Sequence, residues 1–345
     1  MRTTAPAHLK LLQGPGLYLR ALLTALLLIL AMPGMTGWWF LLFPALVPLF
    51  SALGRLSAKQ SICAGMFCGI FYNAGLFYWI VPMLQKFGGL QPATAVAVLL
   101  LLAAYMAVYT ALFCLLLNYL LLQTNSSGNA ATLLLAAPFF WTGLDFLRGI
   151  LFTGIPWMDL GYAVYRQPLL IQGADIGGHY LITFAVVLIN ALLFWFISRI
   201  HALSSASVSS SGYQFRYPIT VVLLLSCLGG YSVMRYRHVS SETAAADTAL
   251  VSAVQGNIKQ SMKWLPAEKA KTVERYIDLS TQALEGEEKP ELLVWPETAL
   301  PFYPARESLM NSIRAFIRKN EVRLLTGSPY FTVDPQKQTS YDKRV

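Results

Sequence analysis

The chain has 345 residues, of which 56% are hydrophobic and only 12% are charged, and this composition excludes an ordinary soluble globular protein. The net charge of +9 does not indicate a nucleic-acid partner, because the basic residues flank apolar runs instead of clustering on one face. Up to Met234 the sequence has ten Lys and Arg, three Asp and no Glu, whereas from Arg235 onward it has sixteen Lys and Arg and fourteen Asp and Glu. The two parts are therefore expected to face different solvents.

Seven apolar segments before Met234 are candidate membrane-spanning helices, since about 20 apolar residues cross the hydrocarbon layer. They are approximately Leu17 to Met32, Trp38 to Leu53, Ser61 to Met83, Ala93 to Leu122, Ala131 to Phe146, Tyr180 to Ile200 and Pro218 to Met234. The first two are short and marked by prolines. The first also has the basic start of a signal peptide, but six apolar segments follow it, so we interpret it as a retained anchor.

The basic residues predict the orientation of these segments. With a cytoplasmic N-terminus, seven of the ten Lys and Arg lie on the cytoplasmic side, against Lys86, Arg148 and Arg166 outside, as the positive-inside rule expects. An odd number of crossings then places everything after Met234 in the periplasm of a bacterium. We therefore predict a multi-pass inner-membrane protein with a membrane domain at 1–234, a linker at 235–247 and a second domain at 248–345.

One outside segment, FLRGILFTGIPWMDLGY from Phe146 to Tyr162, places Arg148 and Asp159 at membrane level among Gly, Pro and aromatic residues. This pattern favours a re-entrant or interfacial turn over a ligand site, although a charge inside the membrane also indicates function. The four cysteines all lie in apolar runs, where a thiol behaves as a small hydrophobe.

From Thr248 the pattern changes to that of a layered α/β domain. A strand is predicted at Ala249 to Ile258, an amphipathic helix at Lys263 to Leu284, a strand at ELLVW from Glu291, a helix near Glu307 to Lys319 and a strand at Val322 to Thr326. Fewer than 100 residues follow Ala249, which is small for such a domain. The domain is expected to be incomplete.

Glu297 follows the apolar strand and lies between two prolines in LLVWPETALP. A carboxylate held at the end of a buried strand can act as a general base. A solvated loop residue or a helix cap is the alternative. The four histidines lie outside the α/β segment, and metal-ligand spacing, a phosphate-binding glycine loop and a nucleophile elbow are absent from the sequence, so no metal or cofactor is expected.

Several motifs together resemble one family. VQGNIKQSMKW, LLVWPETALP and LLTGSPY look like the opening motifs of the nitrilase-type (carbon-nitrogen hydrolase) domain of apolipoprotein N-acyltransferases. FYWIVPMLQKFGG, LLAAYMAVYTALF and FLRGILFTGIPWMDLGY are similar to the transmembrane motifs of that family, in the same order. The resemblance implies a polytopic helical membrane domain followed by part of an αββα sandwich.

The resemblance also implies an activity. Such enzymes transfer an acyl chain from a phospholipid to the amino group of the N-terminal diacylglyceryl-cysteine of an apolipoprotein, through a thioester on a Glu-Lys-Cys triad. Glu297 matches the glutamate of the triad. Trp264 matches a tryptophan near the mouth of the site, where it would contact substrate. The alternative interpretation, given equal weight, is that Trp264 is an amphipathic residue at the start of a helix or at the membrane surface.

The lysine and cysteine motifs of the family are not found. Lys343 lies so near the end of the chain that its side chain would not be held in a fixed position to stabilise an oxyanion. The four cysteines lie in the apolar segments. The chain is therefore expected to be truncated and inactive as given. Two alternatives remain open, a membrane-tethered nitrilase-type amidase and a transporter-like membrane protein without enzymatic activity.

Overall fold

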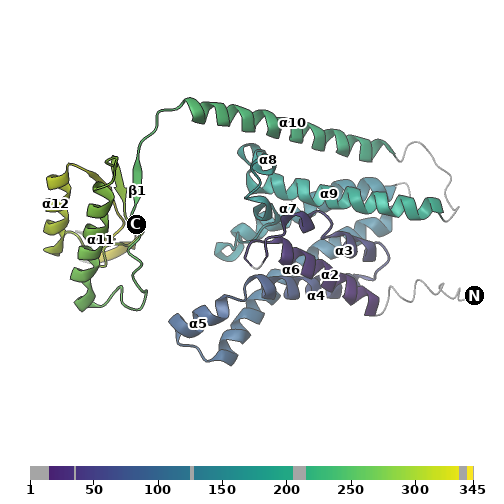
Figure 1. Ribbon diagram of the computed structural model, residues 1–345. Helices are drawn as coiled ribbons and strands as arrows, with labels where there is room; N and C mark the ends of the chain where they lie inside the picture. The colour runs from purple at the N-terminus through teal and green to yellow at the C-terminus, as the bar shows by residue number, and fades with distance from the viewer. Residues whose placement is uncertain (1–14, 35, 125–127, 205–214, 334–339, 345) are drawn as a thin grey trace, which may run out of the picture. The chain divides into compact units, whose positions relative to one another are not determined.

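The structure is a computed structural model that describes residues 15–34, 36–124, 128–204, 215–333 and 340–344. It divides into two compact units, Met1–Thr243 and Ala244–Val345, which we call unit 1 and unit 2. Unit 1 is helical, whereas unit 2 combines helices with short strands (Figure 1). Each unit has its own hydrophobic core.

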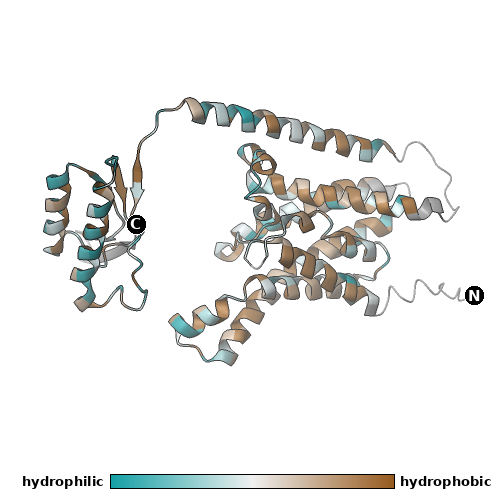
Figure 2. Ribbon diagram, in the orientation of Figure 1, coloured by the Kyte–Doolittle hydropathy of each residue, from teal (hydrophilic) through white to brown (hydrophobic). Residues whose placement is uncertain are grey.

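Unit 1 is built mainly from apolar helices (Figure 2). Its α-helices are α2 (Pro15–Ala31), α3 (Val47–Ala52), α4 (Ala58–Leu76), α5 (Ile80–Gly88), α6 (Pro92–Gln123), α7 (Gly128–Ile150), α8 (Pro168–Ile171), α9 (Ala174–Ser204) and α10 (Arg216–Ala245). Its 3-10 helices are η1 (Trp39–Leu42), η2 (Leu151–Thr153) and η3 (Leu160–Val164). A helix that is apolar on all sides is typical of a membrane span.

Four helices in the described part of the chain are long and apolar enough to cross a membrane, namely Pro92–Gln123, Ala131–Thr153, Ala174–Ile200 and Arg216–Ala245. A fifth span arises if α4 and α5, which are bent by 54° at a short break, count as one. The remaining two expected spans form the shorter apolar helices Gly16–Ala31 and Trp39–Ala52. The protein is therefore a membrane protein, and four or five helices among the described residues are long enough to span the bilayer.

The segment 39–52 is broken because Pro44 and Pro48 interrupt a continuous helix. Two amide side chains from other helices hydrogen-bond backbone groups here, one within this segment and one in the turn that follows it. Asn190 accepts from the Leu46 N–H at 2.8 Å and donates to the Leu42 carbonyl at 2.9 Å. Asn118 accepts from the Gly54 N–H at 2.8 Å and donates to the Leu56 carbonyl at 2.9 Å. Irregular backbone is thus tolerated here because it is buried in protein and hydrogen-bonded.

Helices α4 and α6 approach closely through two glycines one turn apart on α4. A Cβ atom at Gly65 would lie 2.5 Å from the Ala111 Cα, and one at Gly69 would lie 2.7 Å from the Ala107 Cα. This spacing is the small-residue pattern that lets membrane helices pack backbone against backbone.

The expected linker at 235–247 is largely helical, because α10 continues to Ala245. No Gly or Pro interrupts residues 235–245, and the side chain of Arg235 is held by Asp175 of α9 at 2.9 Å. The helix therefore extends past the apolar segment, which we predicted to end at Met234.

Unit 2 has the predicted order of strand, helix, strand, helix, strand. These elements are β1 (Val251–Ala253), α11 (Lys269–Leu284), β2 (Leu292–Val294), α12 (Leu309–Asn320) and β3 (Arg323–Leu325), with a 3-10 turn η5 (Pro266–Glu268) before α11. The amphipathic helix begins at Lys269 instead of Lys263, after the turn that starts at Pro266. β4 (Pro329–Val333) and β5 (Ser340–Arg344) form a separate antiparallel pair.

The three short strands form a parallel sheet in the order β1-β2-β3. Leu293 of the central strand is fully buried in one core with Val273 and Tyr276 of α11 and Ile313 and Phe316 of α12. These two helices lie side by side (Figure 1), and their apolar faces form that core with the sheet. Unit 2 is thus a layered α/β unit.

Candidate functional site

Glu297 lies just beyond the carboxyl end of the central strand β2. Ala253, Val294 and Leu325 are aligned across the sheet, so the loops that follow the three parallel strands leave at the same edge. In open α/β sheets, ligands bind at this edge. The structure therefore places Glu297 where three loops converge.

The loop that carries Glu297 is tightly held by its neighbours. Thr298 has a φ of 53°, and the Ala299 N–H donates to the Pro296 carbonyl at 3.0 Å. Behind the loop, a Cβ atom at Gly327 would lie 2.7 Å from the Thr298 N and 3.1 Å from the Glu297 Cα. Only glycine allows the β3 loop to approach this closely, and positive φ at a non-glycine residue is typical of functional sites.

Trp295 anchors the loop to helix α11. Its ring is buried and stacks on Tyr276 with a centroid distance of 5.1 Å, and its Nε1 donates to the Ser280 hydroxyl at 2.9 Å. Ser280 interrupts the apolar face of α11 in the sequence. The structure explains this interruption, since Ser280 is the partner that a buried indole N–H requires.

A polar cavity of about 220 Å³ opens beside the Glu297 loop. Its lining includes Gln255, Asn257 and Lys263 together with Tyr276 and Pro296. The Lys263 ammonium group donates to the Glu297 carbonyl at 3.3 Å. The Glu297 side chain is exposed, and its loop neighbours Pro296 and Ala299 line this cavity.

The neighbouring Trp264 is 48% exposed and directly follows Lys263. Sequence reasoning did not select Lys263, although its place beside Trp264 in VQGNIKQSMKW was a usable signal. Lys343 lies in β5, where its backbone pairs with Tyr330, and its side chain lies outside the described residues.

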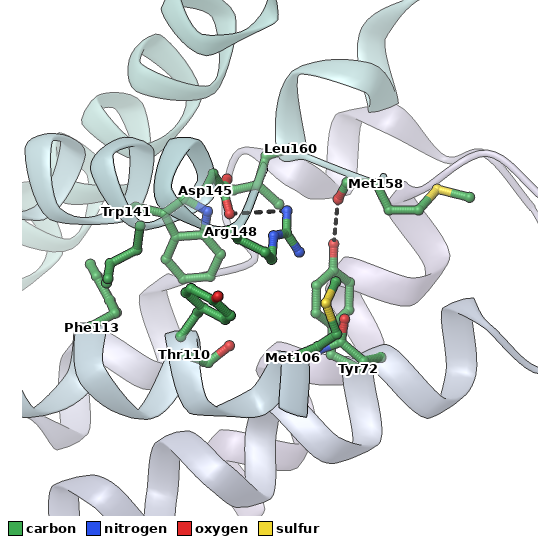
Figure 3. A pocket seen from close by; sticks show the side chains of 12 residues that line it. Tyr72, Met106, Thr110, Phe113, Trp141, Asp145, Arg148, Met158 and Leu160 are labelled. Atoms are coloured by element: carbon green, nitrogen blue, oxygen red, sulfur yellow. Dashed lines mark hydrogen bonds and ion pairs between the residues drawn. The ribbon is translucent and has the colours of Figure 1, made fainter. Parts of the chain in front are cut away.

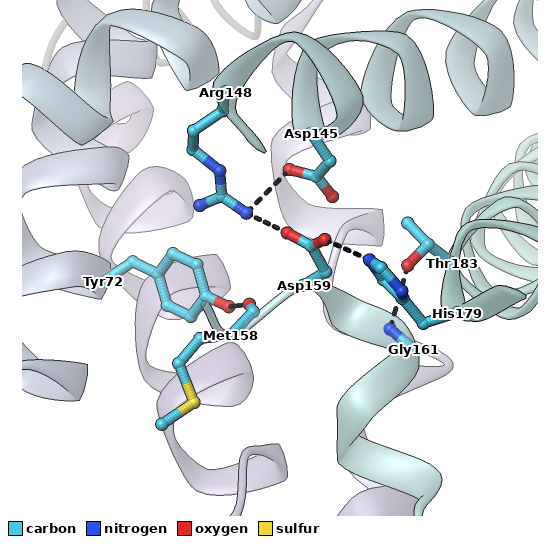
Figure 4. A network of polar contacts seen from close by, with 8 residues as sticks. All are labelled: Tyr72, Asp145, Arg148, Met158, Asp159, Gly161, His179 and Thr183. Atoms are coloured by element: carbon cyan, nitrogen blue, oxygen red, sulfur yellow. Dashed lines mark hydrogen bonds and ion pairs between the residues drawn. The ribbon is translucent and has the colours of Figure 1, made fainter. Parts of the chain in front are cut away.

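A group of charged side chains is buried in unit 1, at the C-terminal end of α7 (Figure 4). Arg148 forms ion pairs with Asp159 and, at 3.2 Å, with Asp145. On its other side the Asp159 carboxylate contacts the His179 Nε2 at 2.7 Å. The Asp159 side chain has no exposed surface, so its charge is stabilised entirely by these partners.

This network closes the segment from Phe146 to Tyr162 into the predicted turn. The turn includes Phe152, Thr153 and Met158, which have φ values of 51°, 74° and 60°. A Cβ atom at Gly154 would lie 1.9 Å from the Gly149 carbonyl oxygen, so glycine is required there. Sequence reasoning found Arg148 and Asp159 but did not identify His179 as their partner.

A small cavity of about 20 Å³ lies beside this network, between α4, α6 and α7 (Figure 3). Three atoms of its lining, Trp141 Nε1, Asp145 Oδ2 and Arg148 Nε, are buried without a hydrogen-bond partner in the described part of the chain. The volume is that of a single water site. The cavity therefore belongs to the support of the turn and is too small for a lipid or peptide substrate.

No group of three or more His, Cys, Asp or Glu residues that could hold a metal ion occurs among the described residues. Cys63 and Cys68 lie on α4, Cys114 on α6 and Cys227 on α10. All four are therefore carried by the apolar helices of unit 1.

Residues 24–192 match the model of the apolipoprotein N-acyltransferase N-terminal domain. Among curated proteins, the chain is 35% identical over 321 residues to an apolipoprotein N-acyltransferase of Geobacter metallireducens, covering 93% of this chain and 58% of that protein. It is also 30% identical to one of Vibrio parahaemolyticus, covering 83% and 52%, and 31% identical to one of Pseudomonas putida, covering 84% and 54%.

The chain is thus similar to apolipoprotein N-acyltransferases over most of its length. It spans a little over half the length of the curated relatives that it matches. The part matched by the family model contains Arg148, Asp159 and His179, whereas Glu297 lies beyond it. The Geobacter alignment covers 321 residues, more than unit 1 contains, so the similarity to apolipoprotein N-acyltransferases extends into unit 2.

Proposed function

We propose that this chain is part of an enzyme that transfers a fatty acyl chain from a membrane phospholipid to an apolipoprotein. The acceptor is the α-amino group of the N-terminal diacylglyceryl-cysteine. The similarity to apolipoprotein N-acyltransferases and the apolar helices of unit 1 support this proposal. The observation that carries it is the rigid loop that presents Glu297 beside a polar cavity.

In this proposal, unit 2 is the first part of a nitrilase-like domain. Its parallel sheet, with α11 and α12 packed against it, is compatible with half of an αββα sandwich. The protein is an inner-membrane protein with a cytoplasmic N-terminus, and unit 2 lies in the periplasm. Periplasmic placement would bring Glu297 to the compartment in which an exported apolipoprotein is found.

Glu297 acts as the general base in the proposed reaction. Its carboxylate first takes the proton of a cysteine thiol, and the thiolate attacks the phospholipid ester to form a thioester. Glu297 then gives this proton to the departing alkoxide of the lyso-phospholipid, which restores the carboxylate. The carboxylate then takes a proton from the incoming amine, which attacks the thioester carbonyl and frees the thiol. The cysteine and the oxyanion-binding lysine are not assigned to residues of this chain. Trp264, beside Lys263, is proposed to contact the substrate.

The test is the variant Glu297→Gln, introduced into the chromosomal gene so that the protein is made as it exists in the cell. We expect a loss of at least about 100-fold in acyl transfer to apolipoproteins, since a positioned general base contributes about 10²–10⁴-fold. Mass spectrometry of lipoprotein N-termini measures the product, and labelled phospholipid measures the acyl-enzyme.

The matched control is Glu291→Gln, which removes an exposed carboxylate just before the same strand. It should leave the acyl-enzyme yield unchanged. A normal acyl-enzyme yield in Glu297→Gln would exclude Glu297 as the base. Failure of labelled phospholipid to acylate the wild-type protein would instead favour a tethered amidase.

A further inference from the structure

Unit 1 has a polar cavity beyond the C-terminal end of α2, which the proposed reaction does not use. Its volume is about 390 Å³, within the range of about 300–1,000 Å³ that small-molecule sites occupy. Thr36 and Trp39 line it from the start of η1 and the segment before it. Tyr165, Arg166 and Gln167 line it from the segment that follows η3. Two parts of the chain that are distant in sequence therefore form one cavity.

Arg166 is the single charged residue among those that line the cavity, and unit 1 offers it no carboxylate. Residues 1–234 contain three acidic residues, all of them aspartates. Arg148 pairs with two of these aspartates, and Arg235 pairs with the third. Within the described part of the chain, no ion pair of Arg166 is found. The positive charge at this cavity is thus left for a ligand to neutralise.

The lining also offers hydrogen-bond donors beside this charge. The Arg166 guanidinium lies over the Tyr165 ring, 5.4 Å from its centroid, and it has five N–H donors in a fixed fork that matches phosphate oxygens. The Gln167 amide adds a further donor group. Neither side chain makes a hydrogen bond to another of the described residues. An arginine beside a neutral amide is typical of a site for a phosphate group.

The aromatic residues around the cavity indicate which kind of phosphate it meets. Trp39 and Tyr165 line the cavity, and the adjacent Trp38 is 49% exposed. The apolar helix α2 ends at Ala31, shortly before these residues. Tryptophan and tyrosine gather where a membrane protein passes the lipid headgroups. We therefore expect the cavity at headgroup level, where phosphate belongs to phospholipids.

The charge of the lining also distinguishes between headgroups. A zwitterionic headgroup carries an ammonium group, which Arg166 would repel and for which the lining has no carboxylate. An anionic headgroup such as phosphatidylglycerol has no such group.

We propose that this cavity binds the phosphate of an anionic phospholipid through Arg166 and Gln167. The lipid is a bound partner of the membrane domain. The cavity is lined by unit 1 residues only, so lipid binding does not depend on Glu297 of unit 2.

The test is a competition between two lipids for the full chain purified in detergent. The probes are palmitoyl-oleoyl phosphatidylglycerol and the corresponding phosphatidylethanolamine, added in equal amounts, and native mass spectrometry measures which lipid is retained. The wild-type protein should prefer phosphatidylglycerol. This preference should fall about tenfold in Arg166→Gln, the loss expected for one charge-assisted hydrogen bond. Arg166→Lys should keep part of it.

Two further variants separate the cavity from general attraction of anionic lipid to positive charge. Gln167→Leu keeps the charge but removes the amide, and it should weaken retention of phosphatidylglycerol. Lys86→Gln removes an exposed positive charge that we predicted on the same side of the membrane but that does not line the cavity. It should keep the wild-type preference. Glu297→Gln should also keep it, which separates this site from the proposed reaction.

Equal retention of the two lipids by the wild-type protein would overturn the proposal, as would an unchanged preference in Arg166→Gln. Displacement of the retained lipid by added inorganic phosphate would show that the cavity recognises free phosphate, and it would overturn the assignment to a lipid.

Discussion

Glu297 shows how a single residue obtains a fixed position from its surroundings. The carboxyl end of a central parallel strand sets its place, Trp295 anchors the chain just before it, and the backbone at Gly327 packs behind it. The place after a strand was predictable from LLVWPETALP. The support from Ser280 and Gly327 was not, because these residues come from other elements.

Gly327→Ala tests the support behind the loop. The new methyl group would meet the Thr298 N at 2.7 Å, so we expect a loss of about 1–3 kcal/mol in the free energy of unfolding of unit 2. Thermal unfolding followed by thermolysin cleavage within unit 2 measures this loss. Gly286→Ala is the control, since its methyl group would meet no atom closer than 3.6 Å. Equal stability of the two variants would contradict the tight packing.

Arg148→Met tests the buried network of unit 1. The substitution leaves the Asp145 and Asp159 carboxylates without their common cation, and removing one partner of a buried ion pair costs about 3–5 kcal/mol. We expect a lower melting temperature and aggregation in detergent, measured by size-exclusion chromatography and thermal scanning. Arg166→Met, at an exposed position, is expected to behave like the wild-type protein. A melting temperature for Arg148→Met equal to that of Arg166→Met would refute the structural role of the network.

At the scale of elements, hydropathy located the apolar segments of unit 1 but did not show which of them form continuous helices. Residues 39–52 are broken at two prolines, and the break is tolerated because Asn190 satisfies its backbone. In unit 2 the period of the apolar residues predicted the order of strands and helices, because each of these elements buries one face in a local core.

Gly65→Ala tests the packing of α4 on α6. Its methyl group would lie 2.5 Å from the Ala111 Cα, which forces the helices apart and should cost about 1–3 kcal/mol. Gly143→Ala makes the same change on α7 with no atom within 4 Å, and it should gain up to about 1 kcal/mol from helix propensity. Thermal unfolding in one detergent compares the two variants. A Gly65→Ala protein as stable as Gly143→Ala would disprove the close helix contact.

At the scale of the whole molecule, the division into an apolar unit and a charged unit follows from the uneven distribution of acidic residues. Tyr231 and Arg235, in the C-terminal half of α10, contact Asp175 at the start of α9. The two ends of α10 therefore lie at different positions along the length of the helices of unit 1. If α10 spans the membrane, its two ends lie on opposite sides of the bilayer.

Reporter fusions test this orientation. Alkaline phosphatase, which is active only in the periplasm, should be active when fused after Ala246 and inactive when fused within residues 205–214. The basic residues Arg199 and Arg216 flank the second site, as expected for a cytoplasmic loop. The reverse pattern of activity would invert the proposed topology.

The sequence by itself determined the membrane character, the α/β order of unit 2 and the place of Glu297 after a strand. These features depend on composition and short-range periodicity. Tertiary structure alone decided that Asn190 would support Leu46, 144 residues away, that His179 would join Arg148 through Asp159, and that Thr36 and Arg166 would line the same polar cavity. Such contacts depend on how helices that are distant in the sequence pack together, and this packing cannot be predicted from local sequence patterns.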